Sequence, residues 1–288
     1  MVQTTTTTAD SAIPELWSTI TADQREENLI VFNMYDRRYE EEAKGKAYDT
    51  IHIQGVNNYT TGVQSTTPGG VTSLTYEAMA FATQINIAIN THAYHAFDIQ
   101  SDAELLTNIN LMEKAAKKSS YAVALKLDDD AAALVDDFST ARGSLLVPLD
   151  LDDVNTMMLD LNKAIVPTND RFFIMSPDQH AHFLSVERLL SNLYSGSVGS
   201  VDTNMQQRGY FFTGYGAKWY WSGNVEGSSA AGHDNGMFQR EVVAVAVVDN
   251  NRTHLFYDID TDSTKHAIHV VYGLKEVRDD HGVWAKGL

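Results

Sequence analysis

The sequence predicts an α+β fold, and three observations support this class. Apolar and polar side chains alternate from Gln84 to Ile99, which is the period of a β-strand. After Ser101 the period changes to that of an amphipathic helix. Short apolar runs in the second half of the chain are typical of buried strands. The sequence shows no internal repeat and no linker that would separate two folding units.

Composition excludes several classes of function. The 288 residues are 43% hydrophobic, which suffices for a globular core. The absence of cysteine excludes disulfides, thiolate metal sites and cysteine nucleophiles, and fits a protein made in a reducing cytoplasm. A formal net charge of −17 repels phosphate backbones, so sequence-specific nucleic-acid binding is not expected. No apolar run approaches the roughly 18 residues of a membrane span, and no signal peptide is expected.

The N-terminal third predicts an extended excursion from the body of the protein. Residues 1–12 form a Thr-rich polar tail, and a short amphipathic pattern follows at 14–39. Alternation starts at Tyr48, stops at the turn-forming stretch Ser65–Gly70 and resumes toward Ile99. This pattern predicts a long two-stranded loop with a polar tip.

Three candidate metal ligands, His92, His95 and Asp98, lie close together in the predicted strand. Successive side chains of a strand point to opposite faces, so His95 lies on the apolar face and the other two on the polar face. Ligands of one ion must converge to within about 2–2.5 Å of it. A metal site is therefore not expected here, and the length of the strand is the feature that needs an explanation.

A long helix is predicted after this strand. Ser101 and Glu104 have the spacing of a capping box. An apolar stripe opposite a charged face predicts about 25–38 helical residues, well above the usual mean. A coiled coil is the competing interpretation, but the heptads are not sustained. The residues expected to form the buried core face of this helix are Leu105, Ile109, Met112, Ala116 and Val123.

The second half of the chain alternates helices and strands. A helix is predicted at 153–165, followed by a buried strand at 172–175. Ser176 is expected to cap the next helix, with Pro177 at its first position and Gln179 closing a capping box. The last strands are predicted at 254–261 and 266–278, and the run 241–248 fits either a buried strand or a helix.

No combination of polar residues stands out as a catalytic or metal-binding site. His180 and His182 do not converge on a helix, and the acidic run Asp128–Asp130 lacks the glycine of a calcium loop. Both are expected to be solvated helix surface, with an ion held between subunits as the alternative for the acidic run. The sequence DIDTDS at 258–263 is expected to be a turn between strands. Catalytic, cofactor-binding and metal-ligating residues are all predicted to be absent, so the protein is not expected to be an enzyme.

Four segments occur together in an order that is informative. The first, LTYEAMAFATQINIAINTHAYHAFDIQSDAELLTNIN, joins the long strand to the long helix. The others are IVPTNDRFFIMSP, GYFFTGYGAKWYWSGNV and HVVYGLKEVR. Together they resemble the tailed-bacteriophage major capsid protein with the HK97-type fold, in its podovirus-like branch, over nearly the whole chain. The matching residues are Val166, Pro167, Arg171, Pro177, Gly209, Gly214, Ser222, Asn224, Tyr272, Gly273, Lys275 and Arg278, whereas Asp279 replaces an expected proline.

The resemblance implies an HK97-like capsid fold with an N-arm, an extended two-stranded E-loop, a long spine helix of the peripheral domain and an axial domain. The implied parts are 1–42 (N-terminal arm with a short helix), 43–98 (E-loop and return strand), 99–144 (spine helix), 145–260 (axial domain) and 261–288 (C-terminal return to the peripheral domain). The E-loop would reach a neighbouring subunit, which would explain the long strand. The contact residues expected there are Ile51, Ile53, Val56, Val63, Pro68 and Leu74.

The implied function is self-assembly, as hexamers and pentamers, into the icosahedral head around double-stranded DNA, which is enclosed without sequence-specific binding. Portal and scaffold proteins and a decoration protein are implied as partners, with no cofactor and no membrane. The implied location is the virion capsid, after synthesis in the host bacterial cytoplasm. Two alternatives stay open: an encapsulin-like shell around a cargo enzyme, and an acidic metal-dependent hydrolase on an unrelated α+β fold.

Overall fold

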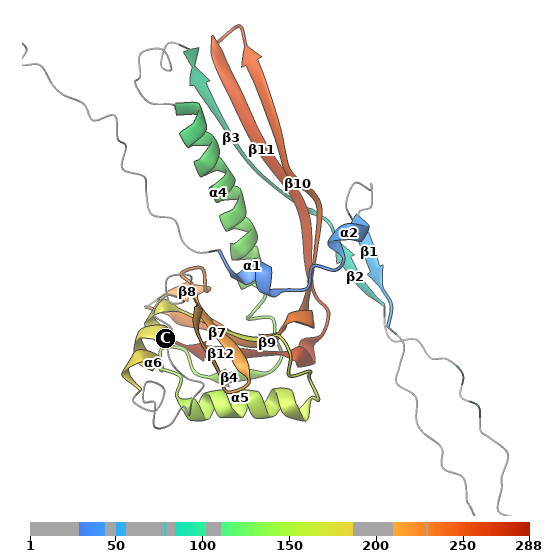
Figure 1. Cartoon of the computed structure of the whole chain (residues 1–288), viewed down its shortest axis with the longest axis vertical. Coiled ribbons are helices and arrows are strands. Elements are labelled where there is room, and N and C mark those ends of the chain that lie inside the picture. The colour runs from blue at the N-terminus through green and yellow to red at the C-terminus, as the bar shows by residue number, and fades with distance from the viewer. Residues whose placement is uncertain are drawn as a thin grey trace, which may run out of the picture.

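The chain forms two lobes along its long axis (Figure 1), in a computed structural model that describes residues 29–43, 50–55, 76, 78, 84–101, 111–186, 210–228 and 230–288. The upper lobe contains a three-stranded sheet and a long helix, and the lower lobe contains a seven-stranded sheet and two shorter helices. The α+β class is therefore confirmed. No helix in the described ranges is both long and apolar enough to cross a membrane.

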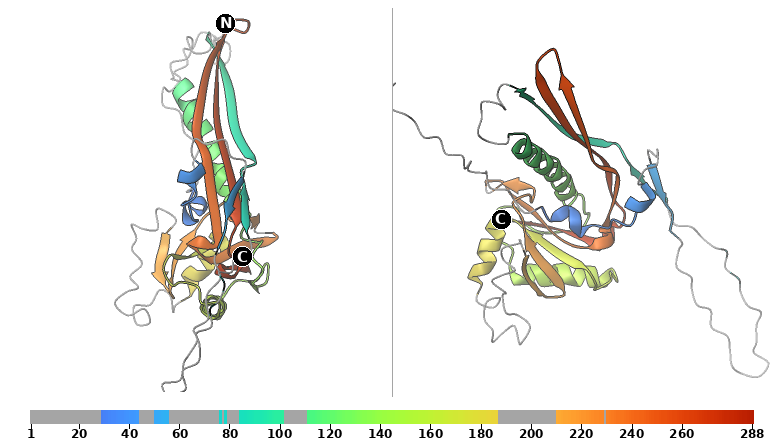
Figure 2. Two further views of the ribbon diagram at one scale, coloured as in Figure 1. Left: turned by 90° about the vertical axis from the view of Figure 1, so that its right-hand side faces the viewer. Right: turned by 45° about the horizontal axis from the view of Figure 1, so that its top comes forward.

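The upper lobe is built on three antiparallel strands, in the order β10 (Val243–Asp258), β11 (Ser263–Glu276) and β3 (Thr91–Gln100). Helix α4 (Leu111–Ala132) packs on one face, where Val123 belongs to the same hydrophobic cluster as Ile268 and Val270 of β11. Figure 2 shows the helix and the sheet from two further directions. Because strand residues alternate between faces, residues 269 and 271 point away from α4.

The single strand predicted from Gln84 to Ile99 is in fact two strands. β2 (Ile85–Ala88) pairs with β1 (Thr50–Ile53), whereas β3 pairs with β11. The strand to which the chain pairs changes where the chain passes close to β11. The approach is so close that a Cβ atom on Gly273 would lie only 2.3 Å from the carbonyl oxygen of Ala88. Glycine permits this approach. The sequence pattern could not reveal the break, since the alternation continues across it.

The lower lobe has the strand order β4-β12-β9-β5-β7-β6, with β8 paired to β9. Every residue of the central strand β5 (Arg171–Met175) is buried, as its apolar run predicts. Helices α5 (Leu151–Lys163) and α6 (Pro177–Ser185) contribute Met157 and Phe183 to its core. The other strands are β4 (Ala141–Gly143), β6 (Tyr210–Gly214), β7 (Ala217–Trp221), β8 (Gly227–Ser228), β9 (Gly232–Gln239) and β12 (Gly282–Gly287).

The chain crosses between the lobes after α4 and at two 3-10 turns, η4 (Arg240–Val242) before β10 and η5 (Asp279–His281) after β11. The expected boundary between the axial domain (145–260) and the C-terminal return (261–288) lies within the hairpin that joins β10 to β11. It does not divide two structural units, because two strands paired in one sheet belong to one lobe. β12, expected in the peripheral part with 261–288, instead lies in the seven-stranded sheet.

Helix α4 confirms the long helix, with 22 described residues that end at Ala132. Val123 is buried in the core, as expected, and Met112 and Ala116 are half-buried. Leu105 and Ile109, together with the predicted capping box, lie largely in the range 102–110, outside the described residues. The competing coiled coil finds no support, because α4 packs against strands and the short helix α1 (Val31–Met34).

The start of α6 was predicted correctly only in part. The hydroxyl of Ser176 accepts the backbone N–H of Gln179 at 3.1 Å, and Pro177 occupies the first helical position. The amide side chain of Gln179 does not close a capping box, because it pairs with both backbone groups of Leu149, at 2.9 and 3.0 Å. That side chain fastens the chain before α5 to α6. The reciprocal box occurs instead at α5, between Asp150 and Asp153.

Candidate functional site at the junction between the lobes

A buried carboxylate connects three parts of the chain where the lobes meet. Asp128 of α4 has no exposed surface. Its oxygens accept the backbone N–H of Phe32 at 2.9 Å and the side-chain amide of Asn224 at 2.8 Å. Burial raises the pKa of this carboxyl, against the hydrogen bonds, which lower it. The expectation of a solvated acidic run is therefore wrong for Asp128, which satisfies backbone donors at the start of α1.

Asp130 of the acidic run also makes a tertiary contact, whereas Asp129 is exposed, as expected. Asp130 pairs with Lys126 and accepts the hydroxyl of Tyr272, each at 2.5 Å. The Tyr35 hydroxyl donates to the carbonyl of Ala131 at 2.9 Å. The last turns of α4 therefore hold both the N-terminal segment and β11. Helical spacing was the available signal, because Asp128 lies three and four positions before the buried Ala131 and Ala132.

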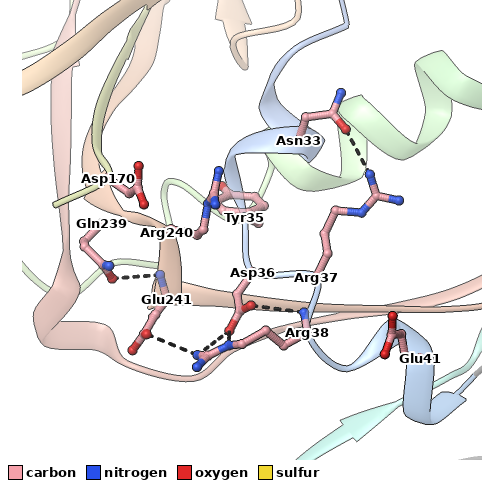
Figure 3. A pocket seen from close by; sticks show the side chains of 10 residues that line it. All are labelled: Asn33, Tyr35, Asp36, Arg37, Arg38, Glu41, Asp170, Gln239, Arg240 and Glu241. Atoms are coloured by element: carbon pink, nitrogen blue, oxygen red, sulfur yellow. Dashed lines mark hydrogen bonds and ion pairs between the residues drawn. The ribbon is translucent and has the colours of Figure 1, made fainter.

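A charged pocket of about 630 Å³ lies beside this junction (Figure 3). Arg38 pairs with Asp36 at 2.6 Å and with Glu241 at 3.2 Å. Glu241 also pairs with Arg278 at 3.0 Å, so a chain of ion pairs holds the N-terminal segment against η4 and η5. The pocket is lined by Asn33, Tyr35, Asp36, Arg37, Arg38, Glu41, Asp170, Gln239, Arg240 and Glu241. Such a lining suits charged or polar groups of another molecule better than an apolar ligand.

The expected E-loop contact residues divide into two groups. Ile51 of β1 is 8% exposed and packs with Ile87, Ala244 and Ala246 of its own chain, and Ile53 packs against the same cluster. The base of the two-stranded loop is therefore anchored on β10, and a contact between Ile51 and a neighbouring subunit stays a prediction. Val56, Val63, Pro68 and Leu74 lie outside the described residues.

The side chain of Arg171 fixes the turn between α5 and β5. Arg171 is 1% exposed, and its guanidinium donates to the carbonyls of Val166 and Pro167 and to the side chain of Asn162, at 2.6, 2.9 and 2.8 Å. These bonds tie the turn after α5 to the first residue of β5. A buried guanidinium with three partners is a structural residue, since each of its three nitrogens donates a hydrogen bond within the chain.

Five of the other matching residues make structural contacts as well, whereas Gly209 lies outside the described residues. The Ser222 hydroxyl accepts the backbone N–H of Asn224 at 3.2 Å, which aims the Asn224 amide at Asp128. Tyr272 and Gly273 make the contacts with Asp130 and Ala88 described above. Arg278 belongs to the ion-pair chain of the pocket. The four segments thus share a role in the fold, and none of these contacts forms a reaction centre.

An acidic pair lies at the crossing from β11 to η5. Asp279 accepts the backbone N–H of Ser139 at 2.8 Å and also its hydroxyl. The pKa of Glu276 is raised to about 7, first by burial and then by a hydrogen bond with Asp279 and the charges of Asp279 and Asp137. Glu276 therefore carries a proton in part of the neutral range.

The histidines do not form the arrangements considered from the sequence. His92 contacts His269 of β11, whereas His95 points to the other face of β3. His180 is half-buried instead of solvated, because its ring stacks on the ring of Trp221, with the two ring centroids 5.5 Å apart. Burial lowers the pKa of His180. Within the described residues, no group of three or more His, Asp or Glu could hold a metal ion.

The turn expected at 258–263 is confirmed between β10 and β11. The Asp258 carboxylate accepts the backbone N–H of Asp260 at 3.0 Å and pairs with Lys265 at 2.5 Å. Asp262 accepts the hydroxyls of Ser101 and Tyr257, at 2.9 and 2.5 Å. The alternating aspartates of this segment therefore stabilise the turn.

Comparison with known proteins identifies the fold. No protein-family model and no curated protein matches the sequence. Among solved structures, one titled "Mycobacterium phage Che8" is 24% identical, with a TM-score of 0.76 over 95% of this chain and 96% of that chain. The "Capsid structure of the Cyanophage P-SCSP1u" is 13% identical, with a TM-score of 0.78 over 100% and 97%. The "Asymmetric unit of bacteriophage PhiM1 mature capsid" is 12% identical, with a TM-score of 0.71 over 95% and 91%.

These similarities extend over nearly the whole of each chain, so they concern both lobes and their arrangement. The HK97-like fold implied by the four sequence segments is confirmed. At these levels of identity the similarity establishes the fold, and function needs a separate argument.

Proposed function

We propose that this chain is a major capsid protein, which assembles into the icosahedral head of a tailed double-stranded DNA bacteriophage. The observation that carries the proposal is the end-to-end match of both lobes to structures of phage capsids. Fold alone does not imply function. Here, however, Arg171, Asn224 and Tyr272 of the matching segments serve the fold of the subunit, as expected of a protein whose task is to assemble.

The surface of the subunit supports the same proposal. Apolar side chains are exposed at the end of the β10–β11 hairpin: Leu255, Phe256, Tyr257 and Ile259. Groups of exposed apolar side chains mark interaction sites in soluble proteins. We assign this hairpin and α4 to the peripheral domain and the seven-stranded sheet to the axial domain. In this assignment 1–42 is the N-arm, and 43–98 is the E-loop with its return strand, which includes most of β3.

The proposal extends to partners and location. Copies of the chain form hexamers and pentamers around DNA, which the acidic subunit encloses without sequence-specific contacts. A portal protein, a scaffold protein and a decoration protein are proposed as partners. Synthesis takes place in the bacterial cytoplasm, and the mature protein resides in the virion. The chain itself is proposed to have no catalytic role.

Electron microscopy and sedimentation of the purified protein test the proposal. Closed shells with nucleic acid inside would support it, and shells that instead contain a cargo enzyme would support the encapsulin-like alternative. A small oligomer under every assembly condition, with a hydrolytic activity lost on chelation, would overturn the proposal in favour of the hydrolase.

Shortening the E-loop is a sharper test. Residues 56–74 are replaced by an Asn-Gly turn, which leaves β1 paired with β2 and Ile51 in its own core. The subunit should stay soluble with unchanged helical circular dichroism, and shell formation should be lost or strongly weakened. Normal assembly of this variant would show that 56–74 is not the intersubunit arm.

A further inference from the structure

Most charged side chains that line the pocket beside the lobe junction already have a partner in the same chain (Figure 3). Asp36 and Glu241 both pair with Arg38, at 2.6 and 3.2 Å. Asp170 pairs with Lys218 at 3.1 Å. Three of the four carboxylates on the wall of the pocket are therefore neutralised within the subunit.

Arg240 differs from the other arginines of the pocket. Arg37 pairs with a glutamate of its own segment at 2.6 Å, and Arg38 has the two partners named above. The exposed guanidinium of Arg240 forms no ion pair within the described residues and lies over the ring of Phe172, 5.9 Å from the ring centroid. Glu41, the remaining carboxylate, lies on a different side of the pocket. Arg240 is therefore available to bind an anionic group of another molecule.

A second surface of the subunit gathers four carboxylates from two segments. Asp136 and Asp137 follow α4, and the backbone N–H of Asp234 donates to the carbonyl of Glu226 at 2.9 Å, beside the β8–β9 turn. Burial and then the charges of Asp137 and Asp234 raise the pKa of Asp136. Burial and then the charges of Asp136 and Asp234 raise the pKa of Glu226. The four carboxylates therefore lie within electrostatic reach of one another, and we call them the acidic surface.

The acidic surface has no paired cation among the described residues. Lys286 stands opposite Asp234 in the strand register, but its ammonium lies over the ring of Trp284, 3.8 Å from the ring centroid. No group of three or more His, Asp or Glu in the same part of the chain could hold a metal ion. A cationic side chain of another molecule would therefore relieve the repulsion among these carboxylates. None of the four lines the pocket that contains Arg240.

The pocket and the acidic surface are complementary, and both belong to the same chain. With a net charge of −17, subunits that pack together must place carboxylates of one copy against cations of the next. Two different patches that bind each other make a head-to-tail contact, and such contacts close into rings where the rotation between copies allows. Rings of five and six copies are part of the proposed function, on which this inference rests.

We propose that the pocket is the docking site for the acidic surface of a second copy of the chain, and that Arg240 pairs there with Asp136 and Glu226 of the partner subunit. The guanidinium presents a planar fork of donors that suits a carboxylate. The contact also relieves the repulsion within the acidic surface. An exposed ion pair contributes little by itself, but every contact of a ring repeats it.

Charge reversal tests the contact in the full chain. Arg240→Glu, and the double variant Asp136→Lys with Glu226→Lys, each place like charges against each other at every contact. Each variant alone should therefore need at least about tenfold more subunit than the wild type to assemble, measured by sedimentation. An equimolar mixture should assemble near the wild-type concentration, because a ring of six in which the two variants alternate pairs opposite charges at every contact. Two folded variants that fail to co-assemble would overturn the proposal.

Lys163→Glu is the matched control, because it makes the same change in net charge as Arg240→Glu at the exposed end of α5, outside both surfaces. It should assemble as the wild type does, and an equal loss would show that net charge decides, which overturns the pocket contact. Circular dichroism checks that each variant folds. If a charge-reversed variant does not fold, Arg240→Gln and Glu226→Gln take its place, and normal assembly of both would overturn the proposal.

The wild type separates this contact from the proposed function. Wild-type shells together with a failure of the variants to co-assemble would overturn the contact alone. A wild type that forms no shell would overturn the proposed function, and sedimentation equilibrium of the mixed variants would then decide the contact. Heterodimers at concentrations where each variant alone is monomeric would support the contact, and their absence would contradict it.

Discussion

The two lobes bury their sheets to different extents. All five residues of β5 in the lower sheet are buried, whereas none of the ten residues of β3 in the upper sheet is. The lower sheet contributes to hydrophobic clusters that include residues of α4 and α5, while the upper sheet has α4 on one face only. The comparison indicates that the centre of the lower sheet lies in the subunit's core, whereas β3, at the edge of the upper sheet, offers its surface to other molecules.

The largest loss of stability is expected in the lower lobe, from Arg171→Ala. The change leaves the acceptors on Asn162, Val166 and Pro167 without their partner and opens a cavity. We expect unfolding to become easier by about 3–5 kcal/mol, measured by denaturant titration. Arg142→Ala is the control, because Arg142 pairs with Asp160 at the surface and should cost no more than about 1 kcal/mol. Equal losses of unfolding free energy in the two variants would show that burial does not distinguish these arginines.

A smaller loss is expected at the junction, from Asp128→Ala, which leaves the Phe32 N–H and the Asn224 amide unpaired. The expected cost is about 2–3 kcal/mol. Asp128→Asn keeps one acceptor and should cost less. Because the pKa of Asp128 is raised by burial, the native state holds its proton longer than the unfolded chain does. Stability should therefore fall as the pH rises above the ordinary aspartate range, and Asp128→Asn should flatten this part of the profile. A steeper profile in Asp128→Asn would contradict the assignment.

Glu276 should dominate the pH dependence of folding stability near neutral pH. Its pKa is raised to about 7, so its contribution to stability is present at low pH and is lost as the pH rises from about 4 to about 7. We expect a decline of about 1–2 kcal/mol, because Glu276 is only partly buried and solvent screens its neighbours. Glu276→Gln should remove the decline in thermal unfolding followed across this range. A decline that persists in this variant would place the responsible group elsewhere.

Sequence reasoning succeeded where a residue's environment is set by its immediate neighbours. The apolar run of β5 and the helix α5 each have one period and one environment. β5 lies where the pattern predicts, and α5 begins and ends two residues before the predicted 153–165. It failed where distant segments decide the environment. Asp128 contacts Asn224, 96 positions away, and His92 contacts His269, 177 positions away. Local periodicity assigns a face to each side chain but does not identify what covers that face.

The smallest effect on the stability of the subunit is expected at the end of the β10–β11 hairpin, where exposed apolar side chains can be tested for a role in assembly alone. Phe256 and Ile259 are 65% and 83% exposed, so Phe256→Ser and Ile259→Ser together should change the unfolding free energy by no more than about 0.5 kcal/mol. Their apolar surface would be buried only against another copy of the chain. If that contact forms in the shell, the double variant should assemble poorly at subunit concentrations that suffice for the wild type, measured by sedimentation. Thr253→Ser is a matched control, because it removes one methyl from the same exposed strand and should assemble normally. Unimpaired assembly of the double variant would mean that the hairpin faces solvent in the shell. The contacts between subunits would then have to come from other surfaces, such as the charged pocket beside Arg38 and Glu241.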